Sequence, residues 1–105
     1  MSNFCLSRRA VNDAGEEFEV LILDSAKSRA VVLFAVGAGG DPDRHLAFLH
    51  SLAAQGCTIA APRSARLVSS APNADELATR ARRLQFAFDK VAKKGIPAAG
   101  VGHSV

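Results

Sequence analysis

The sequence contains no tryptophan and no tyrosine, so its six phenylalanines are the only aromatic side chains. Alanine, valine and leucine supply most of the apolar volume, which predicts a core of small and medium side chains. With 105 residues, 49% of them hydrophobic and 22% charged, the chain has the composition of a globular domain rather than of a disordered one. We therefore expect one folded domain over residues 1–105, or part of a larger one.

Cysteine is also scarce, and Cys5 and Cys57 lie far apart in the sequence. They form no CxxC pair, and no histidines cluster at metal-ligand spacing, which argues against a disulfide framework and against a zinc site. We expect neither a metal nor a cofactor. The first residues lack the apolar stretch of a signal peptide, and no run approaches the length of a membrane span. These absences predict a protein of the reducing cytoplasm that binds no membrane.

Charge of one sign is in small excess, since 13 Lys and Arg residues against 10 Asp and Glu residues give a net charge of +3. The densest basic group follows one helical pattern and is mixed with acidic residues. We interpret it as the solvated face of a helix and expect no nucleic-acid partner. Its basic members are Arg80, Arg82, Arg83, Lys90, Lys93 and Lys94, and its acidic members are Asp75, Glu76 and Asp89.

Four segments have the apolar patterns of strands. Residues Glu17 to Asp24 begin with alternation and thicken into a continuous apolar run, which indicates a strand. Residues Ala30 to Val36 are apolar on both faces, as in a buried parallel strand. Residues Cys57 to Pro62 and Ile96 to Val101 are shorter apolar runs that we also interpret as strands.

Two further segments have helical spacing. In the first, Asp41 is a candidate N-cap and Pro42 suits the first turn, so we expect a helix from Asp43 to about Gln55 that stops at Gly56. The second begins at a capping-box pattern, Asn73 with Glu76, and continues until Gly95. Its expected buried stripe consists of Leu77, Ala81, Leu84, Phe88 and Val91.

The order strand, strand, helix, strand, helix, strand predicts an α/β domain, with a mostly parallel sheet and flanking helices. In such sheets, ligands bind at the carboxyl ends of the strands. Two glycine-containing turns follow strands at that end: the one that begins at Gly37 and the one that begins at Gly102. Both are candidate functional segments.

The second of these turns, Gly102-His103-Ser104, matches the first half of the G-x-S-x-G nucleophile elbow. That elbow is a tight turn between a strand and a helix that raises a serine hydroxyl above the sheet edge. Glycine two residues before the serine keeps such a turn free of side-chain clash. A plain turn with an N-cap serine is the alternative interpretation of the same three residues.

Taken together, "VVLFAVGAGGDP", "HLAFLHSLAAQGCTIAAPR" and "GIPAAGVGHSV" resemble the N-terminal half of an α/β-hydrolase, from the strand before the oxyanion loop to the nucleophile elbow. The resemblance covers residues 18–105. It implies that residues 1–105 are a single incomplete α/β-hydrolase domain, cut at the elbow. For the parent protein it implies ester or acyl hydrolysis of a small-molecule substrate.

The resemblance also implies roles for individual residues. Ser104 would be the nucleophile, and the backbone N–H groups of Ala38 and Val105 would form the oxyanion hole. Gly37, Gly39 and Gly102 would shape the two turns. Where the family usually has histidine before the first glycine of the oxyanion turn, this chain has Val36.

The acid and the histidine of the triad follow the nucleophile in this family, and no residue follows Val105. The other candidates serve better elsewhere: His103 as an elbow residue, His45 and His50 as helix residues, Asp41 and Asp43 as caps. We therefore expect a fragment that lacks triad-level turnover by itself.

Two other functions remain open from the residues. The glycines from Gly37 to Gly40 resemble half of a dinucleotide-binding fingerprint, and Arg63, after the next strand, could suit the 2′-phosphate of NADP. The expected third glycine of that fingerprint is absent near Pro42. The third interpretation is a non-catalytic remnant that self-associates through an exposed sheet edge.

Overall fold

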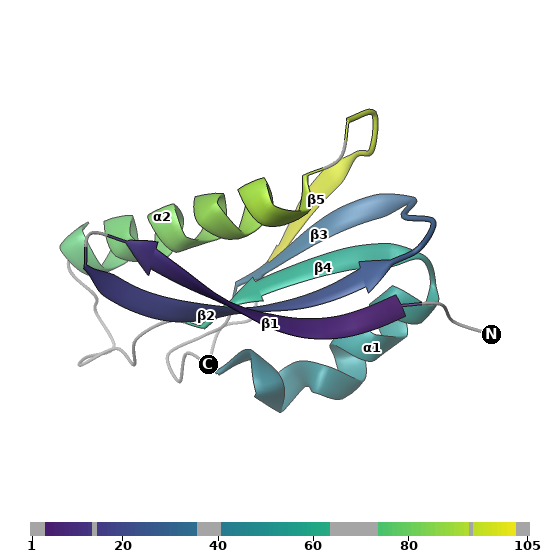
Figure 1. Ribbon diagram of the computed structural model, residues 1–105, viewed down its shortest axis with the longest axis horizontal. Coiled ribbons are helices and arrows are strands. Elements are labelled where there is room, and N and C mark those ends of the chain that lie inside the picture. Colours follow the sequence, from purple (N-terminus) through teal and green to yellow (C-terminus); the bar gives the residue numbers. More distant parts are fainter. Residues whose placement is uncertain (1–3, 14, 36–40, 64–73, 93, 103–105) are drawn as a thin grey trace.

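The computed structural model describes residues 4–13, 15–35, 41–63, 74–92 and 94–102 (Figure 1). These residues form one sheet flanked by helices. The strands are β1 (Phe4–Asp13), β2 (Glu16–Ser25), β3 (Ala30–Ala35), β4 (Cys57–Pro62) and β5 (Ala98–Gly102). A short 3₁₀ helix, η1 (Pro42–His45), leads into α1 (Leu46–Ala54), and the longer helix is α2 (Ala74–Val91).

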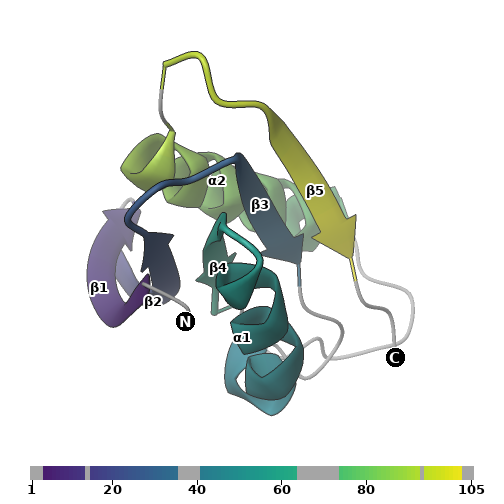
Figure 2. The ribbon, with the colours of Figure 1, turned by 90° about the vertical axis from the view of Figure 1, so that its right-hand side faces the viewer.

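The strand order across the sheet is β1-β2-β4-β3-β5. β1 and β2 pair antiparallel, as do β2 and β4, whereas β3 is parallel to both β4 and β5. The two helices lie on opposite faces of the sheet (Figure 2). The predicted α/β architecture with flanking helices is confirmed, and its parallel part is β4-β3-β5 within a mixed sheet.

The sequence pattern revealed no element before Glu17, whereas β1 occupies this region. β1 forms a hairpin with β2, and the turn closes where the N–H of Gly15 donates to Asn12 Oδ1 at 3.0 Å. Gly15 has φ of +89°, which glycine adopts without strain. In β1, Val11 is buried while residues 5–10 are exposed. An edge strand of this kind gives little apolar alternation for a sequence pattern to detect.

The apolar run of β2 is continuous because helices cover both faces of the sheet there. Val20 and Ile22 face α2, and the intervening Leu21 and Leu23 face α1. Because side chains of a strand alternate between faces, a strand covered on both faces needs apolar residues at every position. The strand predicted over Glu17–Asp24 is confirmed as β2.

Two apolar clusters, one on each face, form the core. The cluster under α1 contains Leu21, Leu23, Val32, Phe34, Leu49, Ala53, Ile59 and Ala61. The cluster under α2 contains Val11, Phe18, Val20, Ile22, Val31, Ala60, Ala87 and Val91. Most of these side chains are of small or medium size, as the composition predicts.

The helix expected from Asp43 to Gln55 is confirmed, with its first turn tightened into η1. Asp41 is the cap, since its Oδ1 accepts a hydrogen bond from the N–H of Asp43 at 2.9 Å, and Pro42 follows in the first turn. The helix stops at Gly56, whose φ is +96°.

α2 is also confirmed as a helix, but its buried line differs from the predicted stripe. Arg83, Ala87 and Val91 are buried, whereas Leu77 is 53% exposed and Ala81 is exposed. From its charge, we expected Arg83 to lie on the solvated face of the helix. That prediction is wrong, since the side chain is buried. Its guanidinium lies 4.7 Å from the centre of the Phe18 ring, and its Nη1 donates to the carbonyl of Arg63 at 3.1 Å.

The rest of the predicted basic face agrees with solvation: Arg82, Lys90, Lys94, Asp75 and Asp89 are exposed, and Arg80 is half-buried. Lys93 and the Glu76 side chain lie outside the description. None of the helices in the described ranges is long and apolar enough to cross a membrane.

Candidate active site

The candidate site lies at the carboxyl ends of the parallel strands, which finish at Ala35, Pro62 and Gly102. In the register of β3 and β5, Ala35 is the partner of Gly102. Neighbouring strands are about 4.8 Å apart. The chain therefore leaves these two strands at adjacent points, toward the glycine turn in one case and toward Ser104 in the other.

Of the residues predicted for the site, the structure describes Gly102, the exposed last residue of β5. A Cβ added at Gly102 would meet no described atom within 4 Å, so the steric need for glycine there stays a prediction. The others lie outside the described residues, and their roles also remain predictions: Gly37, Ala38, Gly39, Ser104 and Val105.

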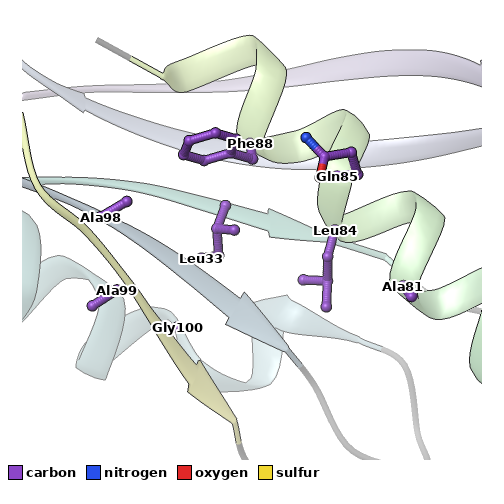
Figure 3. Close-up of a pocket in the computed structure, with 8 residues that line it drawn as sticks. All are labelled: Leu33, Ala81, Leu84, Gln85, Phe88, Ala98, Ala99 and Gly100. Atoms are coloured by element: carbon purple, nitrogen blue, oxygen red, sulfur yellow. The ribbon is translucent and has the colours of Figure 1, made fainter. Parts of the chain in front are cut away.

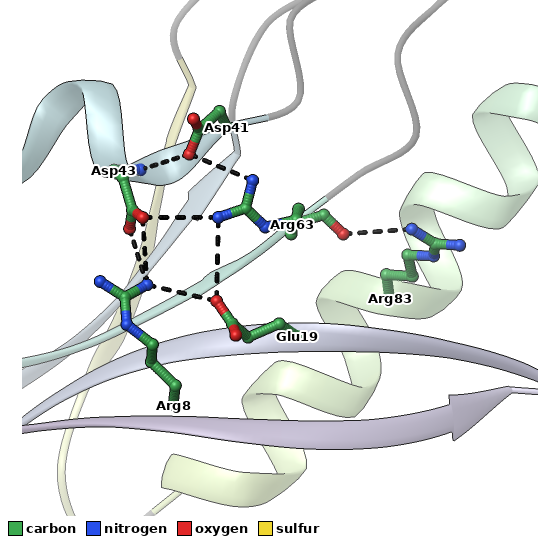
Figure 4. A network of polar contacts seen from close by, with 6 residues as sticks. All are labelled: Arg8, Glu19, Asp41, Asp43, Arg63 and Arg83. Carbon is green, nitrogen blue, oxygen red and sulfur yellow. Dashed lines mark hydrogen bonds and ion pairs between the residues drawn. The ribbon is translucent and has the colours of Figure 1, made fainter.

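A network of ion pairs borders this end of the sheet (Figure 4). Arg63, directly after β4, places Nη1 at 3.3 Å from Asp41 Oδ1 and Nη2 at 3.4 Å from Asp43 Oδ2. Arg8 of β1 places Nη1 at 2.8 Å from Asp43 Oδ1 and at 3.2 Å from Glu19 Oε1. The network thus joins the hairpin β1–β2, the end of β4 and the start of η1.

The carboxylates that surround Arg8 favour its charged form. Hydrogen bonds to Asp43 and then to Glu19 raise the pKa of Arg8 above its ordinary value. Arg8 therefore stays charged at every pH at which the protein is handled. Since all these side chains are between one third and two fifths exposed, solvent screens the pairs, and each pair alone contributes little to stability.

Arg63 is held at both its side chain and its backbone. Its N–H donates to the carbonyl of Glu19 at 2.8 Å, and its own carbonyl accepts from Arg83. Three carboxylates, those of Glu19, Asp41 and Asp43, lie within 4 Å of its guanidinium. A phosphate at this position would be repelled by them, which argues against Arg63 as the ligand of an NADP 2′-phosphate.

Asp41 and Asp43 have structural roles here. Asp41 caps η1 and pairs with Arg63, and the carboxylate of Asp43 is shared between Arg8 and Arg63. The prediction of Asp41 as a cap is confirmed, whereas that of Asp43 as a cap is wrong, because Asp43 lies inside η1 and its N–H is the group that Asp41 caps. The sequence pattern did not reveal Arg8 or Glu19, because their pairing depends on the register between β1 and β2.

Both histidines of the first helical region contact phenylalanine rings. His45 is half-buried, 5.2 Å from the ring centre of Phe34 in an edge-on arrangement. His50 is exposed and lies 5.3 Å from the ring of Phe4. Both contacts pack an imidazole ring against a phenylalanine ring. Within the described ranges, no three His, Cys, Asp or Glu side chains gather in a way that could hold a metal ion.

A hydroxyl cluster lies at the opposite end of the sheet. Ser25 Oγ donates to the carbonyls of Ala53 and Cys57, each at 3.1 Å, and Thr58 Oγ1 accepts from the N–H of Ser25 and contacts Ser28 Oγ. These bonds satisfy backbone groups where α1 and β4 meet the end of β2. The cluster thus stabilises the fold, far from the candidate site along the strands.

An open pocket of about 410 Å³ lies between α2 and β5 (Figure 3). Ala81, Leu84, Gln85 and Phe88 of α2 form its wall, and Leu33, Ala98, Ala99 and Gly100 form its floor. Gln85 is the one polar side chain among these lining residues. The pocket therefore offers an apolar surface and no group that could act as an acid, a base or a nucleophile.

The fold matches solved structures of esterases and epoxide hydrolases. The thioesterase domain from the curacin biosynthetic pathway superimposes with a TM-score of 0.70 at 18% identity, over 94% of this chain and 35% of that one. A thermostable esterase from Pseudomonas putida gives 0.69 at 17% identity, over 99% and 35%. The Cif epoxide hydrolase from Acinetobacter nosocomialis gives 0.65 at 20% identity, over 94% and 30%.

In sequence, no family model and no curated protein matches the chain. The chain spans about a third of the length of the matched structures, and at these identities the likeness concerns the fold. The described strands and helices therefore form part of an α/β-hydrolase fold.

Proposed function

We propose that this chain carries the nucleophile and the oxyanion hole of a serine hydrolase that acts on a small acyl substrate. One observation carries the proposal: Ala35 and Gly102 are register partners at the carboxyl ends of β3 and β5. The segments that hold Ala38 and Ser104 start from these neighbouring points. In an α/β-hydrolase, an oxyanion loop and a nucleophile elbow need this adjacency.

In the proposed reaction, the Oγ of Ser104 bonds to the acyl carbon, and a histidine takes its proton. The negative charge that develops on the carbonyl oxygen is met by the N–H groups of Ala38 and Val105, each worth about 3 kcal/mol in comparable enzymes. The bond to the leaving group then breaks, and the histidine returns the proton to that group. The histidine and its acid are not among the residues we assign.

Chemical rescue tests the nucleophile without those partners. The 105-residue chain is incubated with a fluorophosphonate, with and without imidazole, which can accept the serine proton in place of a histidine. The Oγ of Ser104 bonds to phosphorus, fluoride leaves, and imidazole takes the proton. We expect labelling that rises with imidazole and that peptide mass spectrometry places on Ser104.

Two variants at one position test the oxyanion hole. Ala38→Pro removes the backbone donor and should lower the labelling rate by about 100-fold or more, whereas Ala38→Gly keeps the N–H and should label like the parent chain. Ser104→Ala is the blank. Labelling that is unchanged in Ser104→Ala, or insensitive to imidazole, would count against the proposal.

A second, non-catalytic candidate is self-association, which is favoured by the exposure of β5 at the edge of the sheet. The two candidates are compatible. The cytoplasmic location expected from the sequence stays a prediction; Cys5 and Cys57 are both free thiols, as that location would require.

A further inference from the structure

Arg63 directly follows β4, the strand that lies beside β3 on the side away from β5. In the parallel register of these two strands, Leu33 is the partner of Ala60. Two residues further along both strands, Ala35 at the end of β3 is level with Pro62 at the end of β4. The chain therefore leaves β3 beside the point where Arg63 leaves β4.

Asp41 is the next described residue after Ala35, and it contacts Arg63 as well. Its Oδ1 lies 3.3 Å from Arg63 Nη1, and the same oxygen accepts the capping hydrogen bond from the N–H of Asp43 at 2.9 Å (Figure 4). The residues on both sides of the segment 36–40 are thus fixed against the end of β4. The ladder between β3 and β4 fixes the first of them, and the Arg63 side chain holds the second.

The guanidinium of Arg63 bridges two carboxylates at the helix start. Nη1 faces Asp41, and Nη2 lies 3.4 Å from Asp43 Oδ2. The planar fork of an arginine holds two acceptors at a set distance from each other, whereas the single ammonium of a lysine does not. The shape of this side chain therefore matters in addition to its charge.

The backbone from which this side chain extends is itself held on both sides. The N–H of Arg63 donates to the carbonyl of Glu19 at 2.8 Å, and its carbonyl accepts from Arg83 Nη1 at 3.1 Å. Arg83 is 7% exposed, and its guanidinium lies over the Phe18 ring. Arg63 is therefore anchored on a buried contact, although solvent reaches its own guanidinium.

Arg8 belongs to the same network but holds different carboxylates. Its partners are Asp43 and Glu19, whereas Arg63 lies within 4 Å of these two and of Asp41. Removal of Arg8 would leave a cation beside all three carboxylates. Removal of Arg63 would take the cation from Asp41 and leave Arg8 with the other two. Because the two side chains are 37% and 40% exposed, Arg8 is a matched control for Arg63.

We propose that Arg63 is a positioning residue of the oxyanion hole, which holds Asp41 against the end of β4 and thereby fixes the segment that carries the N–H of Ala38. This inference rests on the proposed function, since it concerns the donor assigned there. In this role Arg63 acts through Asp41 and makes no contact with the reacting atoms. A donor stabilises an oxyanion only at hydrogen-bond distance, and a displacement of about 1 Å can cost about 100-fold in rate.

Labelling of Ser104 by a fluorophosphonate in the presence of imidazole measures the step that the oxyanion hole assists. Arg63→Gln should lower the labelling rate by about 10-fold to 100-fold, whereas Arg8→Gln should label like the parent chain. Arg63→Lys keeps the charge but not the fork, so it should recover part of the rate. Equal labelling rates of the two glutamine variants would overturn the proposal.

A double variant separates positioning from a general loss of structure. If Arg63 acts through the N–H of Ala38, Arg63→Gln should have little further effect in a chain that already carries Ala38→Pro, because that donor is then absent. A merely structural role would lower the labelling rate by the same factor with and without Ala38→Pro. That result would contradict the proposal.

Nuclear magnetic resonance follows the segment without any reaction at Ser104. The backbone amide signals of residues 37–40 should shift in Arg63→Gln and stay near their parent positions in Arg8→Gln. If these shifts appear but the parent chain is not labelled, the proposed function fails, while the anchoring of the segment by Arg63 is supported. Shifts that are no larger in Arg63→Gln than in Arg8→Gln would overturn the inference, whether or not Ser104 reacts.

Discussion

Leu49 is the side chain on which the packing of α1 depends most directly. It is fully buried, in the cluster that joins α1 to Leu21, Leu23 and Ile59 of the sheet. Leu49→Ala removes the buried methyl groups and leaves a cavity, because the surrounding strands relax only in part. We expect a loss of about 3 kcal/mol in the free energy of unfolding, within the usual 2–5 kcal/mol for such changes.

That loss is large for a domain of this size, whose total stability is of the order of 5–15 kcal/mol. At about 4–8 °C per kcal/mol, the melting temperature should fall by about 12–24 °C. Urea denaturation followed by far-ultraviolet circular dichroism measures the change, with the denaturant slope expected to stay constant.

Leu77→Ala is the matched control, since Leu77 lies on α2 with 53% of its surface exposed. It should change the free energy of unfolding by less than about 0.5 kcal/mol. If the two leucines cost the same, or if Leu49→Ala cost less than about 1 kcal/mol, the packing of α1 on the sheet would be refuted.

Three further predictions concern single positions. Gly56→Ala should cost about 1–2 kcal/mol in urea denaturation because φ is +96° there, while Gly100→Ala, in open space, should be nearly neutral. Ser25→Ala should cost about 1–3 kcal/mol by the same assay, since its buried hydroxyl serves two carbonyls. The pKa of Arg8 is raised, so its stabilising charge is lost only in strong alkali; the difference in melting temperature between Arg8→Gln and the parent should be constant from about pH 6 to pH 9.

The parts of the fold that sequence patterns predicted are those with strong local signals. β2, β3 and β4 are runs of apolar residues covered on both faces, and Asp41, Pro42 and Gly56 mark the limits of the first helix. Each of these signals follows from the conformation of a short segment alone. These strands and the limits of this helix could therefore be predicted from the sequence without knowing which segments pack against them.

β1 and the buried line of α2 depend on neighbours instead. β1 is stabilised by pairing with β2, while most of its side chains face solvent. Arg83 is buried because the Phe18 ring and the Arg63 carbonyl receive its guanidinium. The apolar residues Leu84 and Phe88 line the open pocket beside β5 rather than the core. Hydrophobicity alone places Arg83 outside and Leu84 inside, whereas the packing buries Arg83 and leaves Leu84 half-buried.

The candidate site, too, could be predicted from the sequence only in part. The glycine turns and Ser104 were found as motifs, and the structure adds that their strands end side by side. The ion-pair network of Arg8, Glu19, Asp43 and Arg63 had no sequence signal, because it joins segments up to 55 residues apart in number that meet only in the fold.

The adjacency of β3 and β5 is the central claim, since the proposed meeting of Ala38 and Ser104 rests on it. Nuclear Overhauser contacts between backbone protons of the two strands test it directly. The account predicts contacts that follow the parallel register, from Val31 beside Ala98 to Ala35 beside Gly102. Contacts in another register, or a β5 without contacts to β3, would contradict it.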